Sequence, residues 1–154
     1  MRFPTLLTTL ALAASTAHAA DNYIHNNCGY DVWYTSVGGT DAPAPSKISS
    51  GSYIEEGQYF DKTGTAIKIT KIENGIYTDA PVLHFSYSYK ANVELYYDLS
   101  SAFGYVFWGE KITLGPTEGV QGKVIEWDGA PGDSTTQSHF GQDIDLILEL
   151  CASG

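Results

Sequence analysis

The sequence predicts an all-β protein, a single-domain antiparallel β-sandwich. Short segments in which apolar and polar residues alternate recur along the chain, and this period of two is typical of strands with one buried face. Clusters of Gly, Pro, Ser and Asn separate these segments, as they do in turns and loops. The chain has 154 residues and no repeat or heptad pattern, which favours one domain with its own core.

Eight segments are expected to be strands, and in chain order they are residues 22–26, 30–37, 51–56, 65–72, 82–89, 92–100, 119–127 and 143–151. The first two are expected to pair with each other around Cys28-Gly29. Residues 40–51 contain prolines and serines and are therefore expected to form an exposed connection. In the fourth segment Ile67 and Ile69 share one face, and Glu73-Asn74-Gly75 after it is a hairpin-turn signal.

The clearest alternation lies in the later segments. In residues 82–89 and 92–100, aromatic and apolar residues alternate with polar ones. Residues 143–151 alternate leucines with acids; a helix is the alternative there, but the strict alternation favours a strand. Residues 130–142 are polar and are expected to form a surface loop. Six aromatic residues are expected in the core, namely Trp33, Tyr34, Phe85, Tyr87, Tyr97 and Phe107.

Residues 1–19 are expected to be a signal peptide, which leaves residues 20–154 as the mature β-sandwich domain. Arg2 supplies a positive start, residues 6–14 are an apolar stretch, and Ala17-His18-Ala19 is a small-x-small cleavage site. The apolar stretch is too short to span a bilayer as a helix. The protein is therefore expected to be secreted, extracellular or cell-wall associated, without membrane insertion.

Cys28 and Cys151 lie near the two ends of the expected mature chain, and the sequence has no other cysteine. Thiols oxidise in the compartments that exported proteins reach, so two cysteines predict one disulfide. A bridge between Cys28 and Cys151 requires that the two chain ends lie side by side. In the chain-entropy model, closing a loop of this length contributes about 4–5 kcal/mol at most.

The chain carries 18 acidic and 8 basic residues, and its formal net charge is −10. The arginine lies in the expected signal peptide, and the lysines are scattered. Nucleic acid and anionic membranes need a basic patch, so neither partner is expected. The simplest interpretation of the acidity is solubility outside the cell, with a cation site as the alternative. The protein is expected to be a monomer.

The motifs of nucleophilic and metal catalysis are missing. The chain has no Gly-x-Ser-x-Gly elbow and no zinc-site spacing of His or Cys, so no catalytic residue, metal or cofactor is expected. His84 and Asp98 on neighbouring strands are a conceivable metal pair, although a single His on the wet face of a strand is the simpler interpretation. Glu94 and Asp98 share a strand face, and sugar hydrolysis needs two facing carboxylates. The same pattern arises in any acidic protein with alternating strands.

Two tryptophans are candidates for ligand binding. Trp127 lies between Glu126 and Asp128, and Trp108 lies between an aromatic residue and a glycine. An aromatic face flanked by acids stacks well on sugar rings, and Trp is also enriched at protein interfaces. Packing in the interior is the alternative for both rings.

Residues 23–33, Tyr-Ile-His-Asn-Asn-Cys-Gly-Tyr-Asp-Val-Trp, resemble the first hairpin of thaumatin-like proteins. Residues 49–53 resemble their next Gly-containing strand, and residues 95–100 resemble their Tyr-Asp-x-Ser segment. With residues 36–39 and the terminal cysteine, the chain more closely resembles the Blastomyces yeast-phase-specific protein family. These are small, secreted fungal thaumatin-like proteins, some described as antigens. The resemblance implies a thaumatin-like sandwich and agrees with a Cys28–Cys151 bridge.

Larger thaumatin-like proteins have a cleft with an Arg and three acidic residues, which is associated with glucan binding and sometimes with glucan hydrolysis. The resemblance carries one acid to Asp98, while His84 stands at the second position and the third falls near Phe103. The chain has no Arg outside the expected signal peptide. A cleft changed in this way should not support hydrolysis by two carboxylates.

The leading hypothesis is a secreted, non-enzymatic binding protein that acts as an effector or antigen or is associated with the cell wall. Its ligand would be a cell-wall polysaccharide or a host or surface protein. The candidate ligand-binding residues are Asp98, His84, Glu94, Trp108 and Trp127. A weak β-1,3-glucan hydrolase that uses Asp98 with Glu94 is the alternative, and a structural wall component without a specific ligand is a third hypothesis.

Overall fold

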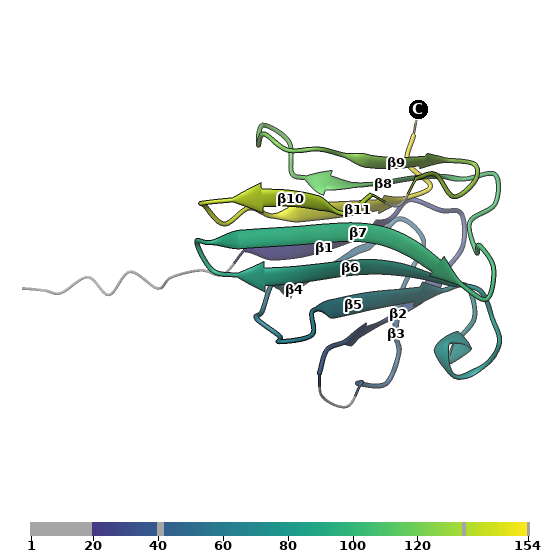
Figure 1. Cartoon of the computed structure of the whole chain (residues 1–154). Helices are drawn as coiled ribbons and strands as arrows, with labels where there is room; N and C mark the ends of the chain where they lie inside the picture. The colour runs from purple at the N-terminus through teal and green to yellow at the C-terminus, as the bar shows by residue number, and fades with distance from the viewer. Residues whose placement is uncertain (1–19, 40–41, 134, 154) are drawn as a thin grey trace, which may run out of the picture.

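The computed structural model describes residues 20–39, 42–133 and 135–153, so the expected signal peptide lies outside the described residues. Two β-sheets enclose one core, which confirms the predicted all-β sandwich (Figure 1). The strands are β1 (Asp21–Asn26), β2 (Val32–Val37), β3 (Ser46–Ile48), β4 (Tyr53–Gly57), β5 (Thr65–Thr70), β6 (Val82–Lys90), β7 (Glu94–Ala102), β8 (Lys111–Pro116), β9 (Ile125–Asp128), β10 (Gln137–Phe140) and β11 (Leu146–Leu150). A short 3-10 helix, η1 (Gly75–Tyr77), lies between β5 and β6.

The two sheets have the strand orders β4-β1-β11-β8-β9 and β10-β7-β6-β5-β2-β3. Neighbouring strands run antiparallel except β1 and β11, which are parallel with Asn22 opposite Leu146. The expected pairing of the first two strands is wrong, because β1 pairs with β4 and β11 whereas β2 pairs with β3 and β5 in the other sheet. The first and last strands of the domain therefore lie side by side.

Several segments differ from the sequence prediction. The expected connection at residues 40–51 contains β3, and the expected loop at 130–142 contains β10. The strand expected at 119–127 begins only at Ile125, and β8 has no counterpart in the sequence prediction. These short segments owe their extended form to ladder hydrogen bonds with a neighbouring strand, which leave no pattern in the sequence. The predicted strand at the C-terminus is confirmed as β11.

The connection between β5 and β6 is longer than the predicted hairpin turn. Asn74 adopts the left-handed backbone conformation, with φ of 59°, as the turn signal implies. However, η1 follows at once, and Gly75 packs so closely on Thr70 that a Cβ at Gly75 would lie 2.9 Å from the Thr70 Cβ. The glycine is therefore needed for this close approach rather than for a two-residue hairpin.

The core lies between the two sheets and is formed by the inward residues of the alternating strands. Phe85, Tyr87, Tyr97 and Phe107 are buried as predicted. Trp33 and Tyr34 are only half-buried. The prediction that Trp33 is a core residue is wrong. Tyr34 lies opposite the buried Ile69, and because successive side chains of a strand point to opposite faces, the adjacent Trp33 points to the outer face.

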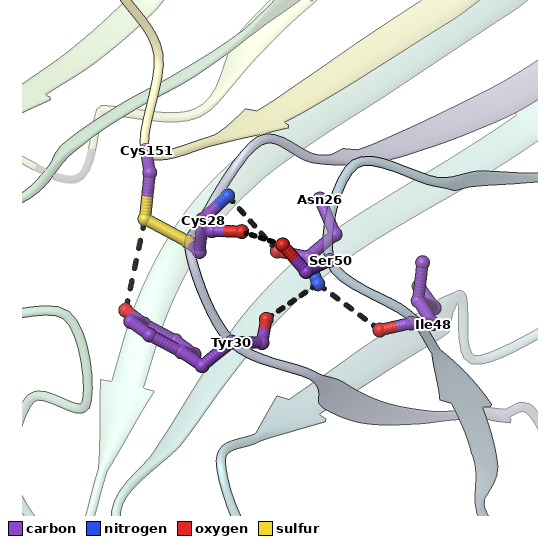
Figure 2. Close-up of a disulfide and its surroundings, with 6 residues drawn as sticks. All are labelled: Asn26, Cys28, Tyr30, Ile48, Ser50 and Cys151. Carbon is purple, nitrogen blue, oxygen red and sulfur yellow. Dashed lines mark hydrogen bonds between the residues drawn. A yellow bond between two sulfur atoms is a disulfide. The ribbon is translucent and has the colours of Figure 1, made fainter.

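A disulfide joins Cys28, after β1, to Cys151, after β11, and confirms the predicted bridge (Figure 2). The two Cα atoms are 5.0 Å apart although 123 positions separate them in sequence. The parallel pairing of β1 and β11 brings both strand ends to the same edge of the sheet, which explains this proximity. The Tyr30 hydroxyl lies 3.6 Å from the Cys151 Sγ and covers one side of the bridge.

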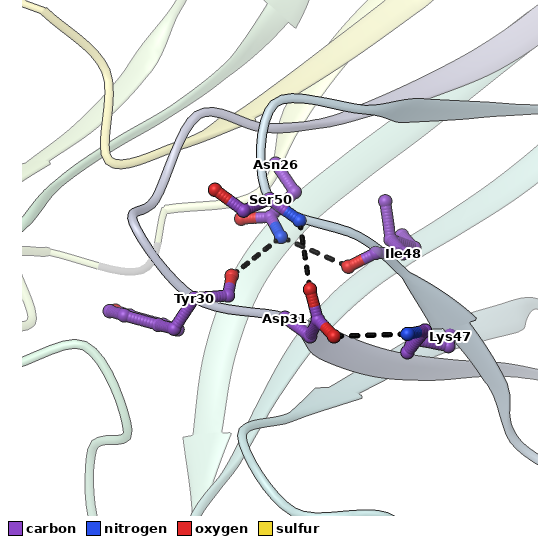
Figure 3. Close-up of polar contacts among 6 residues, drawn as sticks. All are labelled: Asn26, Tyr30, Asp31, Lys47, Ile48 and Ser50. Carbon is purple, nitrogen blue, oxygen red and sulfur yellow. Dashed lines mark hydrogen bonds and ion pairs between the residues drawn. The ribbon is translucent and has the colours of Figure 1, made fainter.

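Asn26 organises the turn that carries Cys28 (Figures 2 and 3). Its side chain is fully buried, and its Nδ2 donates to the Tyr30 carbonyl at 2.9 Å and to the Ile48 carbonyl at 3.0 Å. Its Oδ1 accepts from the Cys28 backbone N–H at 3.2 Å. One amide thus satisfies three backbone groups, two in the turn after β1 and one in β3 of the other sheet.

A second polar contact closes the same corner at the surface (Figure 3). Asp31 accepts a hydrogen bond from the Ser50 backbone N–H at 3.0 Å and pairs with Lys47 Nζ at 3.0 Å. The Ser50 bond and, second, the Lys47 bond lower the pKa of Asp31. Exposed pairs of this kind contribute little to stability, so the buried Asn26 is the stronger determinant of the turn.

Candidate functional site

A groove of about 330 Å³ lies on the outer face of the six-stranded sheet. Its floor is formed by small outward residues of β5 and β6, namely Ala66, Ser86 and Ser88. These side chains are short, so the sheet surface is hollowed here. The remaining lining residues are Val37, Thr63, Gly64, Thr65, Tyr87, Tyr96, Tyr97, Asp98 and Thr136.

Asp98 supplies the carboxylate of the groove. It projects outward from β7, lies opposite Ser86 of β6, and its Oδ2 accepts a hydrogen bond from the Thr136 hydroxyl at 3.2 Å. No ion pair to Asp98 occurs among the described residues. Its remaining oxygen lone pairs can therefore accept hydrogen bonds from a ligand.

Tyr96 forms the aromatic wall of the groove. Its ring meets the ring of Phe140 edge to face, with centroids 5.8 Å apart and an interplanar angle of 88°. Both rings are exposed. Exposed tyrosine faces offer an apolar surface that packs against the C–H face of a sugar ring.

His84 lies on the same outer face, one step further along β6, but it does not line the groove. Partial burial is the main cause that lowers its pKa, Lys68 lowers it further, and the nearby Asp98 carboxylate opposes both. His84 is therefore mainly neutral at pH 7, and it lies beside the groove rather than in it.

Glu94 is separated from Asp98. The two residues lie four positions apart on β7, and a strand rises about 3.3 Å per residue, so their Cα atoms are about 13 Å apart. Glu94 lies opposite Lys90 and Phe140 at the end of the strand. The structure thus places Asp98, His84 and Glu94 on one face without bringing two carboxylates together.

The two tryptophans have opposite environments. Trp108 is 66% exposed in the loop between β7 and β8 and does not line the groove. Trp127 is 2% exposed and packs against Tyr105 with ring centroids 5.5 Å apart. Side chains alternate along β9, so Glu126 and Asp128 point outward and the Trp127 indole points inward. The expectation that these acids flank an accessible Trp127 ring is therefore wrong.

One further carboxyl group is distinctive, although it lies outside the groove. Glu56 of β4 reaches toward the other sheet and accepts a hydrogen bond from the Ser36 hydroxyl at 2.7 Å. Burial raises the pKa of Glu56, and the Ser36 bond opposes that shift. Because Glu56 does not line the groove, it is not a second acid for Asp98.

Sequence reasoning found Asp98 but missed Tyr96, Ser86, Ser88 and Thr136. The alternation of β7 assigns Tyr96 to the wet side of its strand, and that signal is sufficient to find it. Thr136 falls in the expected loop, and only the pairing of β10 with β7 brings it beside Asp98.

Metal and membrane features are missing from the parts of the chain that the structure describes. No group of three or more His, Cys, Asp or Glu side chains in residues 20–39, 42–133 and 135–153 is placed to hold a metal ion. The same residues contain no helix with the length and apolarity needed to cross a membrane.

The Blastomyces yeast-phase-specific protein family matches residues 9–152 of this chain. Among solved structures, the protein elicitor MoHrip2 from Magnaporthe oryzae is similar, with a TM-score of 0.69 and 24% sequence identity. The match covers 87% of this chain and 100% of that one, so the two share a fold. No functionally curated protein matches the chain. The likeness to thaumatin-like proteins stays a prediction.

Proposed function

Because the chain belongs to the Blastomyces yeast-phase-specific protein family, we propose that it is a secreted, non-enzymatic binding protein. Its ligand is a neutral cell-wall polysaccharide, held in the groove on the outer face of the six-stranded sheet. The disulfide supports export, since such bonds form in oxidising compartments.

The observation that carries this proposal is the composition of the groove. The Asp98 carboxylate and the exposed ring of Tyr96 lie beside a floor of small side chains, two of which are serines with hydroxyl groups. A sugar ring needs an aromatic or apolar face for its C–H groups and strong acceptors for its hydroxyls, and charged acceptors make the stronger hydrogen bonds. The volume of about 330 Å³ lies at the lower end of the range for ligand pockets.

Hydrolysis is the weaker candidate. Glycosidases hold two carboxyl groups about 5–10 Å apart. Among the described residues that line the groove, Asp98 is the one acid, and the Glu94 Cα lies about 13 Å from the Asp98 Cα along the strand. We therefore expect binding without release of sugar.

A host or surface protein is the second candidate ligand. The similar protein from Magnaporthe oryzae is a protein elicitor, and a comparable role for this chain would require a partner that detects it. Trp108, which is exposed and lies outside the groove, would serve such a partner better than it serves a sugar.

The test is a pull-down of the purified mature protein on insoluble β-1,3-glucan, chitin and cellulose, with released sugar measured in the same tubes. We expect saturable binding to at least one polymer. Asp98→Asn is expected to weaken it about tenfold, since a hydrogen bond to a charged group contributes about 1.5–3 kcal/mol and the amide keeps one acceptor. Tyr96→Ala is expected to weaken it several-fold.

Two matched variants serve as controls. Asp128→Asn removes an exposed acid of β9, and Tyr53→Ala removes an exposed ring of β4, both from the other sheet. Neither is expected to change binding. Absence of binding to all three polymers, or equal losses in groove and control variants, would refute a polysaccharide groove. Sugar release that Asp98→Asn abolishes would show that hydrolysis was wrongly rejected.

A further inference from the structure

Three loops meet at one end of the sandwich, the end to which β5, β7 and β9 point (Figure 1). They are residues 71–81, 103–110 and 129–133. The first two loops are in contact, because the Lys71 Nζ lies 5.1 Å from the centroid of the Phe107 ring. The last two are joined by a hydrogen bond of 2.8 Å from the Gly109 backbone N–H to the Gly129 carbonyl. The loops therefore form one surface.

Large apolar side chains are exposed on this surface. Each is 60–68% exposed, and they are Ile72, Tyr77, Phe103 and Trp108. We call these four residues the loop-end surface. Single exposed apolar residues are ordinary in a folded protein, whereas a concentration of them on adjoining loops marks an interaction site.

The Trp108 ring is held in a fixed position. It meets the Tyr105 ring edge to face, with centroids 5.6 Å apart and an interplanar angle of 82°. Tyr105 in turn packs against the buried Trp127. The backbone on either side is tied by bonds from the Glu110 N–H to the Phe107 carbonyl and from Gly109 to the next loop. A side chain ordered in advance loses little entropy on binding, and Trp is enriched among residues that dominate interfaces.

Phe103 is exposed at the expense of backbone strain. Its φ is 57°, in the left-handed region, which is unfavourable for a bulky residue. The ring is 68% exposed, so packing in the core does not offset this strain. Strained residues of this kind are concentrated at functional sites.

The charges around the loop-end surface are mostly negative. Four acidic residues lie in the three loops, namely Glu73, Asp79, Glu110 and Asp133. Lys71 is the one basic residue of these loops. Its Nζ lies 4.3 Å from the centroid of the Tyr30 ring as well as near Phe107, so two rings of this protein already engage its charge.

We propose that the loop-end surface binds a protein whose contact surface is apolar at its centre and rich in arginine or lysine around it. The apolar side chains would fill the centre, and the acids would pair with the basic rim. Arginine is especially suited, because its guanidinium group stacks on Trp and pairs with carboxylates. A second copy of this chain would bring the same acids, and anionic lipids would also be repelled, so neither is the occupant.

This inference rests on the second candidate of the proposed function, a protein ligand, and names the chemistry of that partner. It does not require the polysaccharide groove. The groove is lined by the start of β5 and the second half of β6, whereas the loop of residues 71–81 joins the opposite ends of these strands.

The probe is a fluorescein-labelled synthetic peptide in which arginine alternates with leucine, and fluorescence anisotropy measures its binding to the purified, disulfide-bonded protein. We expect saturable binding that Trp108→Ala weakens about tenfold. A peptide with glutamate in place of arginine should not bind, and one with serine in place of leucine should bind more weakly. Trp108→Ala should leave polysaccharide binding unchanged, and Asp98→Asn should leave peptide binding unchanged.

Two further variants separate the apolar contacts from the charge. Phe103→Asn should weaken binding while the Tm is kept or raised, because Asn tolerates the left-handed backbone. Asp79→Asn should weaken binding several-fold and reduce its dependence on salt. The matched controls are Phe60→Ala and Glu118→Gln, an exposed ring and an exposed acid in loops at the other end of the sandwich. Neither should change binding.

Three results would overturn the proposal. The first is no saturable binding of the arginine–leucine peptide. The second is an equal loss in Glu118→Gln and Asp79→Asn, which would mean that the net charge of the whole chain attracts the peptide. The third is binding to phosphatidylcholine vesicles that Trp108→Ala abolishes, without binding of the peptide, which would assign the loop-end surface to a lipid.

Discussion

Replacement of Asn26 by alanine is expected to be among the most destabilising polar substitutions in this protein. The variant loses the two bonds that Nδ2 donates to the Tyr30 and Ile48 carbonyls and the one that Oδ1 accepts from Cys28. The site is fully buried, so water cannot replace the amide without a rearrangement of the turn.

The expected loss of unfolding free energy follows from the backbone groups that Asn26→Ala leaves without a hydrogen-bond partner. A buried hydrogen bond contributes about 0.5–1.5 kcal/mol net, and a buried group that loses its partner costs about 1–3 kcal/mol. Three backbone groups are affected, but the turn can relax toward solvent on one side. We therefore expect Asn26→Ala to lower the free energy of unfolding by about 3 kcal/mol.

Asn22 is a matched control on the same strand. It is also fully buried, but its Nδ2 has no hydrogen-bond partner among the described residues, and its Oδ1 accepts only from Gln58. Gln58 Nε2 has two hydrogens and keeps two other acceptors when that bond is lost. Asn22→Ala is therefore expected to cost about 1 kcal/mol, mostly from lost packing.

The assay is urea unfolding at pH 7 with the disulfide intact, followed by tryptophan fluorescence. Both variants should keep the slope of the wild-type transition, so that a shift of the midpoint reports stability alone. If Asn22→Ala and Asn26→Ala cost the same, side-chain volume rather than hydrogen bonding explains the loss. Asn26 would then not be the residue that organises the Cys28 turn.

Three further predictions concern stability. Replacing both Cys28 and Cys151 by serine should lower the free energy of unfolding by about 5 kcal/mol at most, because the disulfide closes a loop that spans 123 positions. Urea unfolding midpoints measure this loss. A loss below about 1 kcal/mol would contradict the chain-entropy account. The folded-state pKa of Glu56 is raised above its usual 4.5, so its stabilising contribution is complete below that pH and is lost as pH rises through the folded-state value. Glu56→Gln should therefore flatten the decline of stability above pH 4.5, and an unchanged pH profile would contradict the burial of that carboxyl. Trp127→Ala should cost about 3–5 kcal/mol and Trp108→Ala less than about 0.5 kcal/mol in the same assay, and similar losses would mean that their environments are not opposite.

The sandwich and the disulfide could be predicted, because the sandwich follows from residue alternation within single strands and the disulfide from the number of cysteines. Strict alternation in β6, β7 and β11 identifies strands with one buried face. Two cysteines allow a single bridge, whatever the topology. The edge strands β3 and β10 could not be predicted in this way, because a neighbouring strand rather than their own sequence keeps them extended.

The candidate site shows the same division. Alternation places Asp98, Glu94 and Tyr96 on the wet face of β7, and this much was readable from the sequence. Alternation also turns the Trp127 side chain inward. The strand that contains Trp127 begins at Ile125 rather than at residue 119, and without that start the sequence could not show whether Trp127 faces the core or solvent. Which of the outward residues share a groove depends on the strand order.

The sequence by itself determined the fold class, the bridge between the chain ends and the residues that face solvent on the long strands, since each depends on residue type and a period of two. Only the tertiary structure decided that β1 and β11 are parallel neighbours, that Thr136 donates to Asp98, and that the Gln58 backbone N–H donates to the Ala20 carbonyl. The physical reason is that backbone ladders join strands without regard to side-chain identity. Contacts between segments far apart in the chain therefore leave no mark within either segment.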